Sequence, residues 1–135
     1  MSVAVAYQAS ASGRLTLQEA AKEASLRQTA MSVLHIPEGV DIDIIEGQRT
    51  RLREEITRVL GEVNLHDVEW TLEVATGVDV AETVLDLVGD MDVELLVIGA
   101  RRRSAVGKMF LGSVTQTIIL RAEVPVLVVK APARP

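Results

Sequence analysis

Apolar residues recur along the chain in five short runs, which are separated by longer segments with a different spacing. The runs have the length of β-strands, whereas the segments between them place apolar residues three and four positions apart, as an α-helix does. Strands that alternate with helices are typical of parallel β-α-β units. The pattern therefore predicts an α/β fold with strands at 3–7, 29–36, 68–75, 93–98 and 124–129.

Each of the four segments between the strands carries one apolar stripe at helical spacing. The first stripe consists mainly of alanine, so we expect that helix to lie close to the sheet. The third helix begins at Asp79, whose carboxylate can cap free backbone N–H groups, and Glu82 follows at capping-box spacing. The fourth starts near Gly112 and Ser113 and ends before Pro125. The residues expected to face inward are Leu17, Ala20, Ala21 and Ala24; Leu52, Ile56, Val59, Leu60 and Val63; Val80, Val84, Leu87 and Val88; and Val114, Ile118 and Ile119.

Residues 37–47 form the least regular stretch, and we interpret them as a surface connection. On the second helix, Arg51 precedes Glu55 by four positions and Glu54 precedes Arg58 by four. This spacing is typical of ion pairs on helix surfaces. We interpret these charges as a solvated face.

The strands are expected to differ in how completely they are covered. Residues 68–75 alternate apolar and polar side chains, so this strand belongs near an edge of the sheet. Residues 93–98 are almost continuously apolar, as in parallel strands covered on both faces. The last strand is equally apolar, but Pro125 confines it to a strand start, an edge or a bulge. Because an apolar edge exposes unpaired backbone groups, we expect a homodimer through the fifth strand, Val124 to Val129.

Composition and charge narrow the possible classes of protein. The 135 residues correspond to one domain, 1–135, and the absence of cysteine excludes disulfides and thiolate chemistry. A net charge of -5, with one Trp, one Tyr and one Phe, argues against nucleic-acid binding. Strand-like sequence begins at Val3, which leaves no room for a leader, and no apolar run approaches ~18 residues. We therefore expect a cytoplasmic protein with no membrane association.

Candidate catalytic groups are sparse. His35 and His66 have no cysteine or carboxylate at ligand spacing, so we predict no metal site. Ser10, Ser12 and Ser104 lack an identifiable general base. We predict no catalytic residues and a protein that binds its ligand without turning it over.

The landmarks of the whole chain resemble those of the universal stress protein family. The resemblance rests on VAVAYQAS, on SVLHIP, on GVDVAETVLDLV leading to VELLVIGARRRS, and on VGKMFLGSVTQTIILRAEVPVLVV. The family's nucleotide motif is G-x-x-G, nine residues, then G-S or G-T, and Gly99, position 102 and Gly112-Ser113 keep that spacing. The resemblance implies a Rossmann-like three-layer sandwich of the adenine nucleotide alpha hydrolase type, with four helices and five parallel strands in the order 3-2-1-4-5. That order agrees with the two edge strands expected above.

The resemblance also implies an adenine-nucleotide site, because this strand order opens a crevice at the carboxyl ends of strands 1 and 4. Family members that bind ATP place an acidic residue at the end of the first strand and the glycine motif at the phosphates. Glycines let the backbone approach an anion, and a helix start favours negative charge. We assign to a site for ATP, with or without Mg²⁺, the residues Gln8, Ile36, Gly99, Arg101, Arg102, Gly112, Ser113, Val114 and Thr115.

Two residues depart from the family pattern. Gln8 stands where ATP-binding members carry aspartate, and an amide offers one acceptor oxygen where a carboxylate offers two. Arg102 replaces the second glycine. Its side chain either occupies the phosphate space or, with Arg101 and Arg103, supplies charged donors to the phosphates. The sequence leaves open an ATP-binding regulatory protein and a nucleotide-independent homodimeric interaction module in which Arg102 blocks the phosphate site.

Overall fold

The computed structural model describes residues 1–8, 11–37, 42–101 and 112–131. Within these residues strands and helices alternate, as the apolar spacing predicts. Arg102 and Arg103 lie outside the described residues, so the roles expected of them stay predictions. The elements are β1 (Ser2–Ala6), α1 (Ala11–Arg27), β2 (Ala30–His35), α2 (Ile42–Glu62), β3 (Trp70–Val74), α3 (Val80–Asp90), β4 (Val93–Arg101), α4 (Ser113–Arg121) and β5 (Val126–Ala131).

The five strands form one parallel sheet in the order β3-β2-β1-β4-β5, which confirms the expected fold class. β4 continues beyond the predicted end because its last residues pair with β5, with Gly99 opposite Val129. β5 begins after Pro125, whose carbonyl accepts a hydrogen bond from the Leu96 N–H at 2.9 Å. Proline thus stands where its missing N–H is not needed.

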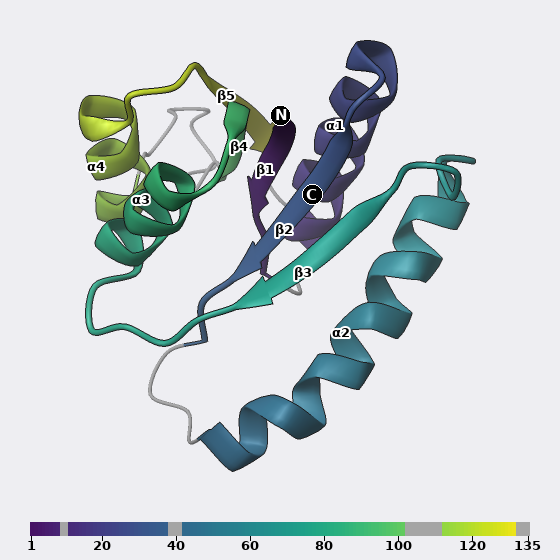
Figure 1. Cartoon of the computed structure of the whole chain (residues 1–135), viewed down its shortest axis with the longest axis horizontal. Coiled ribbons are helices and arrows are strands. Elements are labelled where there is room, and N and C mark those ends of the chain that lie inside the picture. Colours follow the sequence, from purple (N-terminus) through teal and green to yellow (C-terminus); the bar gives the residue numbers. More distant parts are fainter. Residues whose placement is uncertain (9–10, 38–41, 102–111, 132–135) are drawn as a thin grey trace.

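Two helical layers enclose the sheet (Figure 1). α1 and α2 cover one face, where an apolar cluster joins their stripes to Val3, Val5 and Leu95. α3 and α4 cover the other face around Ala4 and Leu96. The sheet is therefore covered on both faces, which explains the nearly continuous apolar character of its central strands. No helix in the described part of the chain is long and apolar enough to cross a membrane.

Two of the predicted helices match their sequence signals closely. The alanine-rich stripe of α1 has no exposed surface, so α1 packs directly on the sheet. α3 begins where its cap predicts, since the Asp79 carboxylate accepts the Glu82 N–H at 3.2 Å. Both signals are local, and both are confirmed.

The interpretation of residues 37–47 as a surface connection is wrong for its second half, because α2 starts at Ile42. Ile45 is only 6% exposed and lies seven residues before Leu52, on the same side of the helix. The interpretation of the charges on α2 as a solvated face also fails at Glu55, which is half-buried and accepts a hydrogen bond from the Tyr7 hydroxyl.

The expected stripe of α4 is only partly buried. Ile118 is 1% exposed, whereas Val114 and Ile119 are 38% and 40% exposed. α4 is short and lies beside the last strands of the sheet (Figure 1), so it buries only part of its apolar surface. Apolar spacing alone did not reveal how much of the helix its neighbours would cover.

Candidate functional site

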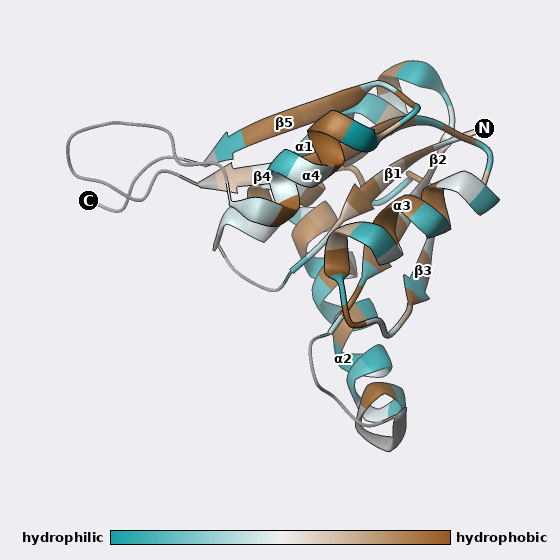
Figure 2. Ribbon diagram, turned by 90° about the vertical axis from the view of Figure 1, so that its left-hand side faces the viewer, coloured by the Kyte–Doolittle hydropathy of each residue, from teal (hydrophilic) through white to brown (hydrophobic). Residues whose placement is uncertain are grey.

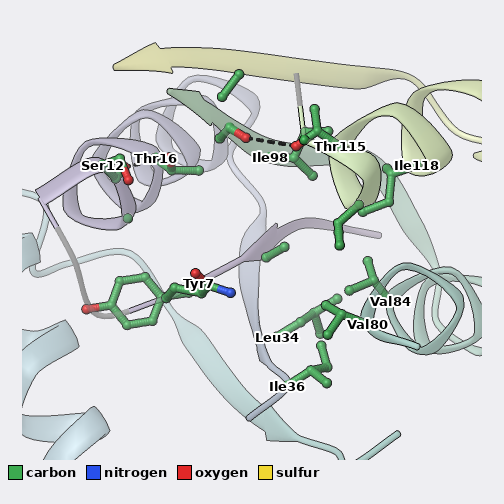
Figure 3. Close-up of a pocket in the computed structure, with 17 residues that line it drawn as sticks. Tyr7, Ser12, Thr16, Leu34, Ile36, Val80, Val84, Ile98, Thr115 and Ile118 are labelled. Carbon is green, nitrogen blue, oxygen red and sulfur yellow. Dashed lines mark hydrogen bonds between the residues drawn. The ribbon is translucent and has the colours of Figure 1, made fainter. Parts of the chain in front are cut away.

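A cleft of about 250 Å³ opens where β1 and β4 end, at the point where the strand order reverses. Figure 3 shows its side chains arriving from both helical layers. The lining residues are Ala6, Tyr7, Gln8, Ser12, Gly13, Thr16, Leu34, Ile36, Val80, Val84, Ile98, Gly99, Ala100, Gly112, Val114, Thr115 and Ile118.

The cleft has an apolar half and a polar half (Figure 3). Leu34 and Ile36 from the end of β2 face Val80, Val84 and Ile118 from α3 and α4, and together they form the apolar half. This half offers a surface for a flat apolar group such as a base.

The polar half offers hydroxyl and amide groups without a formal charge. Ser12 and Thr16 come from the first turns of α1, Thr115 comes from the first turn of α4, and Gln8 is exposed beside them. The Thr16 hydroxyl donates to the Ser12 carbonyl at 2.8 Å, which holds that side chain against its own helix. Groups of this kind bind a polar ligand by hydrogen bonds.

α4 begins at the cleft with a cap that has no side chain. Gly112 adopts φ -64° and ψ 164°, its carbonyl accepts the Gln116 N–H at 3.0 Å, and no side-chain hydrogen bond caps the helix among the described residues. A Cβ built on Gly112 would meet no atom of those residues within 4 Å. The start of a helix presents backbone N–H groups and a partial positive charge. An anion can therefore approach this backbone closely.

Gly99 is a glycine for a different reason. A Cβ at this position would lie 2.6 Å from the Thr16 hydroxyl oxygen, so the missing side chain lets α1 approach β4. On the other side, the Thr115 hydroxyl donates to the Gly99 carbonyl at 3.3 Å. Gly99 therefore links the first turns of α1 and α4, and packing alone explains why this position requires glycine.

We expect Gly99→Ala to lower the free energy of unfolding by about 1–3 kcal/mol, because the added methyl group overpacks a buried contact with Thr16. Gly89→Ala on α3, where an added Cβ meets no described atom within 4 Å, is the control and should not lower stability, because alanine favours a helix. Chemical denaturation of both variants measures the difference. Equal stabilities would show that the contact between Gly99 and Thr16 relaxes without cost.

The structure brings six of the predicted site residues to the cleft: Gln8, Ile36, Gly99, Gly112, Val114 and Thr115. Ser113 lies in the exposed first turn of α4 and is not part of the lining. Arg101 is the last residue of β4, and Arg102 lies outside the described residues.

Sequence reasoning missed the wall that α1 contributes through Ser12, Gly13 and Thr16. The sequence did contain one signal, a polar residue directly before the apolar stripe, since Thr16 precedes Leu17. In the structure Thr16 is buried, with 2% of its surface exposed. Val80 and Val84 were predicted as core residues, and they also line the cleft. The apolar stripe of a helix does not show which of its residues border a cavity.

The described lining contains no carboxylate, no lysine and no histidine. Its one ionisable side chain is Tyr7, and the hydroxyl of Tyr7 donates to Glu55 at 2.7 Å. Burial, together with this hydrogen bond, raises the pKa of Tyr7 above its ordinary value, so the phenol stays protonated at neutral pH. Among the described residues there is no group of three or more potential metal ligands. The arrangement is suited to holding a ligand by hydrogen bonds and apolar contact.

Comparisons with known proteins agree with this architecture. The Universal stress protein family matches residues 1–130. The chain is 34% identical over 128 residues to a universal stress protein of Mycolicibacterium smegmatis (strain ATCC 700084 / mc(2)155), a match that covers 95% of this chain and 96% of that protein. A solved universal stress protein from Archaeoglobus fulgidus is 29% identical with a TM-score of 0.77, covering 96% of this chain and 98% of the other. Another structure from that organism, a complex with dAMP, is 26% identical with a TM-score of 0.72 and the same coverage.

Proposed function

The chain belongs to the universal stress protein family, and on that basis we propose that its cleft binds an adenine nucleotide, with ATP as the ligand. We propose further that the protein acts in the cytoplasm as a regulatory stress-response protein that binds the nucleotide without hydrolysing it. The observation that carries the proposal is the start of α4, which no side chain of the described residues caps, at the edge of a cleft whose other half is apolar.

The chemistry of the cleft fits a nucleotide. The apolar half, with Leu34 and Ile36 on one side, accommodates the base, and Gln8 lies where its amide can hydrogen-bond the sugar. In the proposal the backbone N–H groups at the start of α4 donate to the phosphates, while the Thr115 hydroxyl, which donates to the Gly99 carbonyl, holds the start of α4 against β4. The volume of about 250 Å³ in the described part of the cleft lies just below the range of about 300–1,000 Å³ that is typical of small-molecule sites. The complex of the related Archaeoglobus fulgidus protein with dAMP supports an adenine nucleotide as the class of ligand.

The residues of this cleft act by binding and orientation. Because no carboxylate lies among the described lining residues, Mg²⁺ would enter with the phosphates of the nucleotide. Gln8 remains neutral at all ordinary pH values, so the contact with the sugar adds no negative charge next to the phosphates. In the proposal the absence of this negative charge partly compensates for the loss of the second acceptor oxygen that an aspartate would have provided.

Titration with ATP and Mg²⁺, followed by calorimetry and thermal denaturation, tests the proposal. We expect measurable heat and, at a ligand concentration about 100 times Kd, stabilisation by about 2.7 kcal/mol. If millimolar ATP produces no heat and no stabilisation, the proposal is contradicted, and the nucleotide-independent interaction module is favoured. Arg102→Gly separates the two roles expected of Arg102: binding that appears or strengthens means that Arg102 blocks the site, whereas weakening of a binding seen in the wild type means that it contacts the phosphates.

We propose that the protein forms a homodimer through β5. The two edges of the sheet differ in a way that supports this proposal. β3 carries exposed Thr71 and Glu73, and charged side chains protect an edge from pairing. β5 is apolar along most of its length (Figure 2), with Val126 and Val128 only partly buried. Pairing with the same strand of a second copy would cover this edge.

Sedimentation velocity at tens of micromolar protein is expected to show a dimer that Val128→Lys converts to monomer, because a charge on an apolar edge opposes pairing. Thr71→Lys places the same charge on the other edge strand and should leave the dimer intact. Circular dichroism establishes that both variants are folded. A monomeric wild-type protein, or a dimer that dissociates in the Thr71 variant, would contradict pairing through β5.

A further inference from the structure

Tyr7 directly follows β1 and makes three hydrogen bonds, two to the end of β2 and one to α2. Its N–H donates to the Leu34 carbonyl at 2.9 Å, and its carbonyl accepts from His35 Nδ1 at 3.0 Å. Its hydroxyl donates to Glu55 Oε1 at 2.7 Å. The first two bonds join Tyr7 to the neighbouring strand. Only the third reaches the helical layer, across 48 positions of sequence.

The side chain of Tyr7 leaves the cleft and points toward α2 (Figure 3), and only 2% of the residue is exposed. The next residue, Gln8, is exposed in the cleft. Tyr7 is thus buried and anchored on one side, while Gln8 faces the space proposed for the nucleotide. The bond to Glu55 therefore acts on the end of β1 one residue before a proposed ligand contact.

The bond has the features of a strong interaction. Its acceptor is a carboxylate in the middle of α2, and hydrogen bonds to ionised acceptors are shorter and stronger than neutral ones. Burial raises the pKa of Tyr7 most, and Glu55 raises it further. The positive charges of Arg14 on α1 and Arg58 on α2 lower this pKa, but their effect is smaller. The phenol therefore remains a donor to Glu55 over the whole physiological range of pH.

We propose that Tyr7 and Glu55 are a positioning pair, which fixes the carboxyl end of β1 to α2 so that Gln8 is held in place to contact the nucleotide. The inference rests on the proposed nucleotide site, and it adds a determinant of affinity that lies outside the cleft, on α2. Small displacements of a positioned polar group weaken its hydrogen bonds to a ligand, because those bonds depend steeply on distance and angle.

A set of single variants at Tyr7 and in α2 tests the pair by calorimetric titration with ATP. We expect Tyr7→Phe and Glu55→Ala each to weaken binding by roughly fivefold, a change of the size that one hydrogen bond contributes. Glu55→Gln keeps an acceptor oxygen for the Tyr7 hydroxyl, so it should retain most of the wild-type affinity that Glu55→Ala loses. Glu54→Ala, which removes the neighbouring exposed glutamate, is the matched control and should bind as the wild type does.

The Gln8→Ala background separates positioning from a general structural effect. Without the Gln8 amide, Tyr7→Phe should cause no further loss of affinity, because the group that it positions has been removed. Equal losses of affinity in the presence and in the absence of the Gln8 amide would overturn the proposal and leave Tyr7 a purely structural residue.

Backbone ¹⁵N relaxation of the ligand-free protein provides a readout that does not depend on ATP. The order parameter of Gln8 should fall in Tyr7→Phe and Glu55→Ala but not in Glu54→Ala. An unchanged order parameter would overturn the positioning role, whatever the binding data show. If the wild type binds no ATP while Gln8 loses order in both variants, the nucleotide proposal fails and the anchoring of β1 by Glu55 stands.

Discussion

Gly112→Asp is expected to weaken ATP binding by more than about 100-fold while leaving the fold at least as stable as the wild type. Aspartate is a preferred N-cap residue, and the extended backbone of Gly112, the N-cap of α4, suits it. Its side chain meets no atom of the described residues, because none lies within 4 Å of a Cβ built there. Two like charges about 4 Å apart near a protein surface repel by about 4 kcal/mol, which exceeds the roughly 2.7 kcal/mol of a 100-fold change.

Two controls separate charge from size and from position. Gly112→Asn has the same shape and capping ability without the charge, so it should retain much more of the affinity. Gly61→Asp adds the same charge at another open glycine, on α2, and should leave binding unchanged. Calorimetry gives the affinities and thermal denaturation gives the stabilities. Unchanged affinity in Gly112→Asp would mean that phosphates do not bind at the start of α4.

Raising the pH above about 10 is expected to destabilise the fold through Tyr7. The folded state keeps the phenol buried and bonded to Glu55, which raises its pKa, whereas the unfolded chain ionises it near its ordinary value of 10.0. Above that pH the unfolded state binds fewer protons than the native state, so the free energy of unfolding falls as the pH rises. The slope approaches about 1.4 kcal/mol per pH unit, until the native phenol ionises as well.

Tyr7 is the one tyrosine of the chain, so tyrosinate absorbance reports its ionisation directly. The signal should appear at a higher pH than in a tyrosine model peptide and coincide with loss of the circular dichroism of the fold. Tyr7→Phe should be less stable at neutral pH but should lack this contribution to the alkaline slope. Ionisation of Tyr7 near pH 10 in a fully folded protein would contradict the prediction.

Much of the fold follows from patterns within single segments. The alternation in 68–75 predicts an edge strand, and β3 is one. The Asp79 cap and the alanine-rich stripe of α1 predict two helices that form as expected. The resemblance to universal stress proteins predicts the family and the strand order, and both are confirmed. These features depend on backbone geometry and side-chain periodicity, which neighbouring residues define.

The sequence predicted mainly the side of the candidate site that β4 and α4 form. The glycine motif points to Gly99, Gly112 and Thr115, and these residues do line the cleft. The motif does not reveal that Gly99 accommodates Thr16, a residue 83 positions earlier in the chain than Gly99. It also does not reveal which side of α4 stays exposed, and Val114 was wrongly expected to face inward.

The sequence by itself determined the alternation of strands and helices, most of the apolar stripes, the edge position of β3 and the position of the glycine motif. All of these depend on residues a few positions apart. Only the tertiary structure decided that Thr16 packs on Gly99, that Glu55 turns inward to Tyr7 and that Ile45 extends α2. Such contacts join distant segments, and side-chain burial depends on what the rest of the chain places against a residue, which no local pattern records.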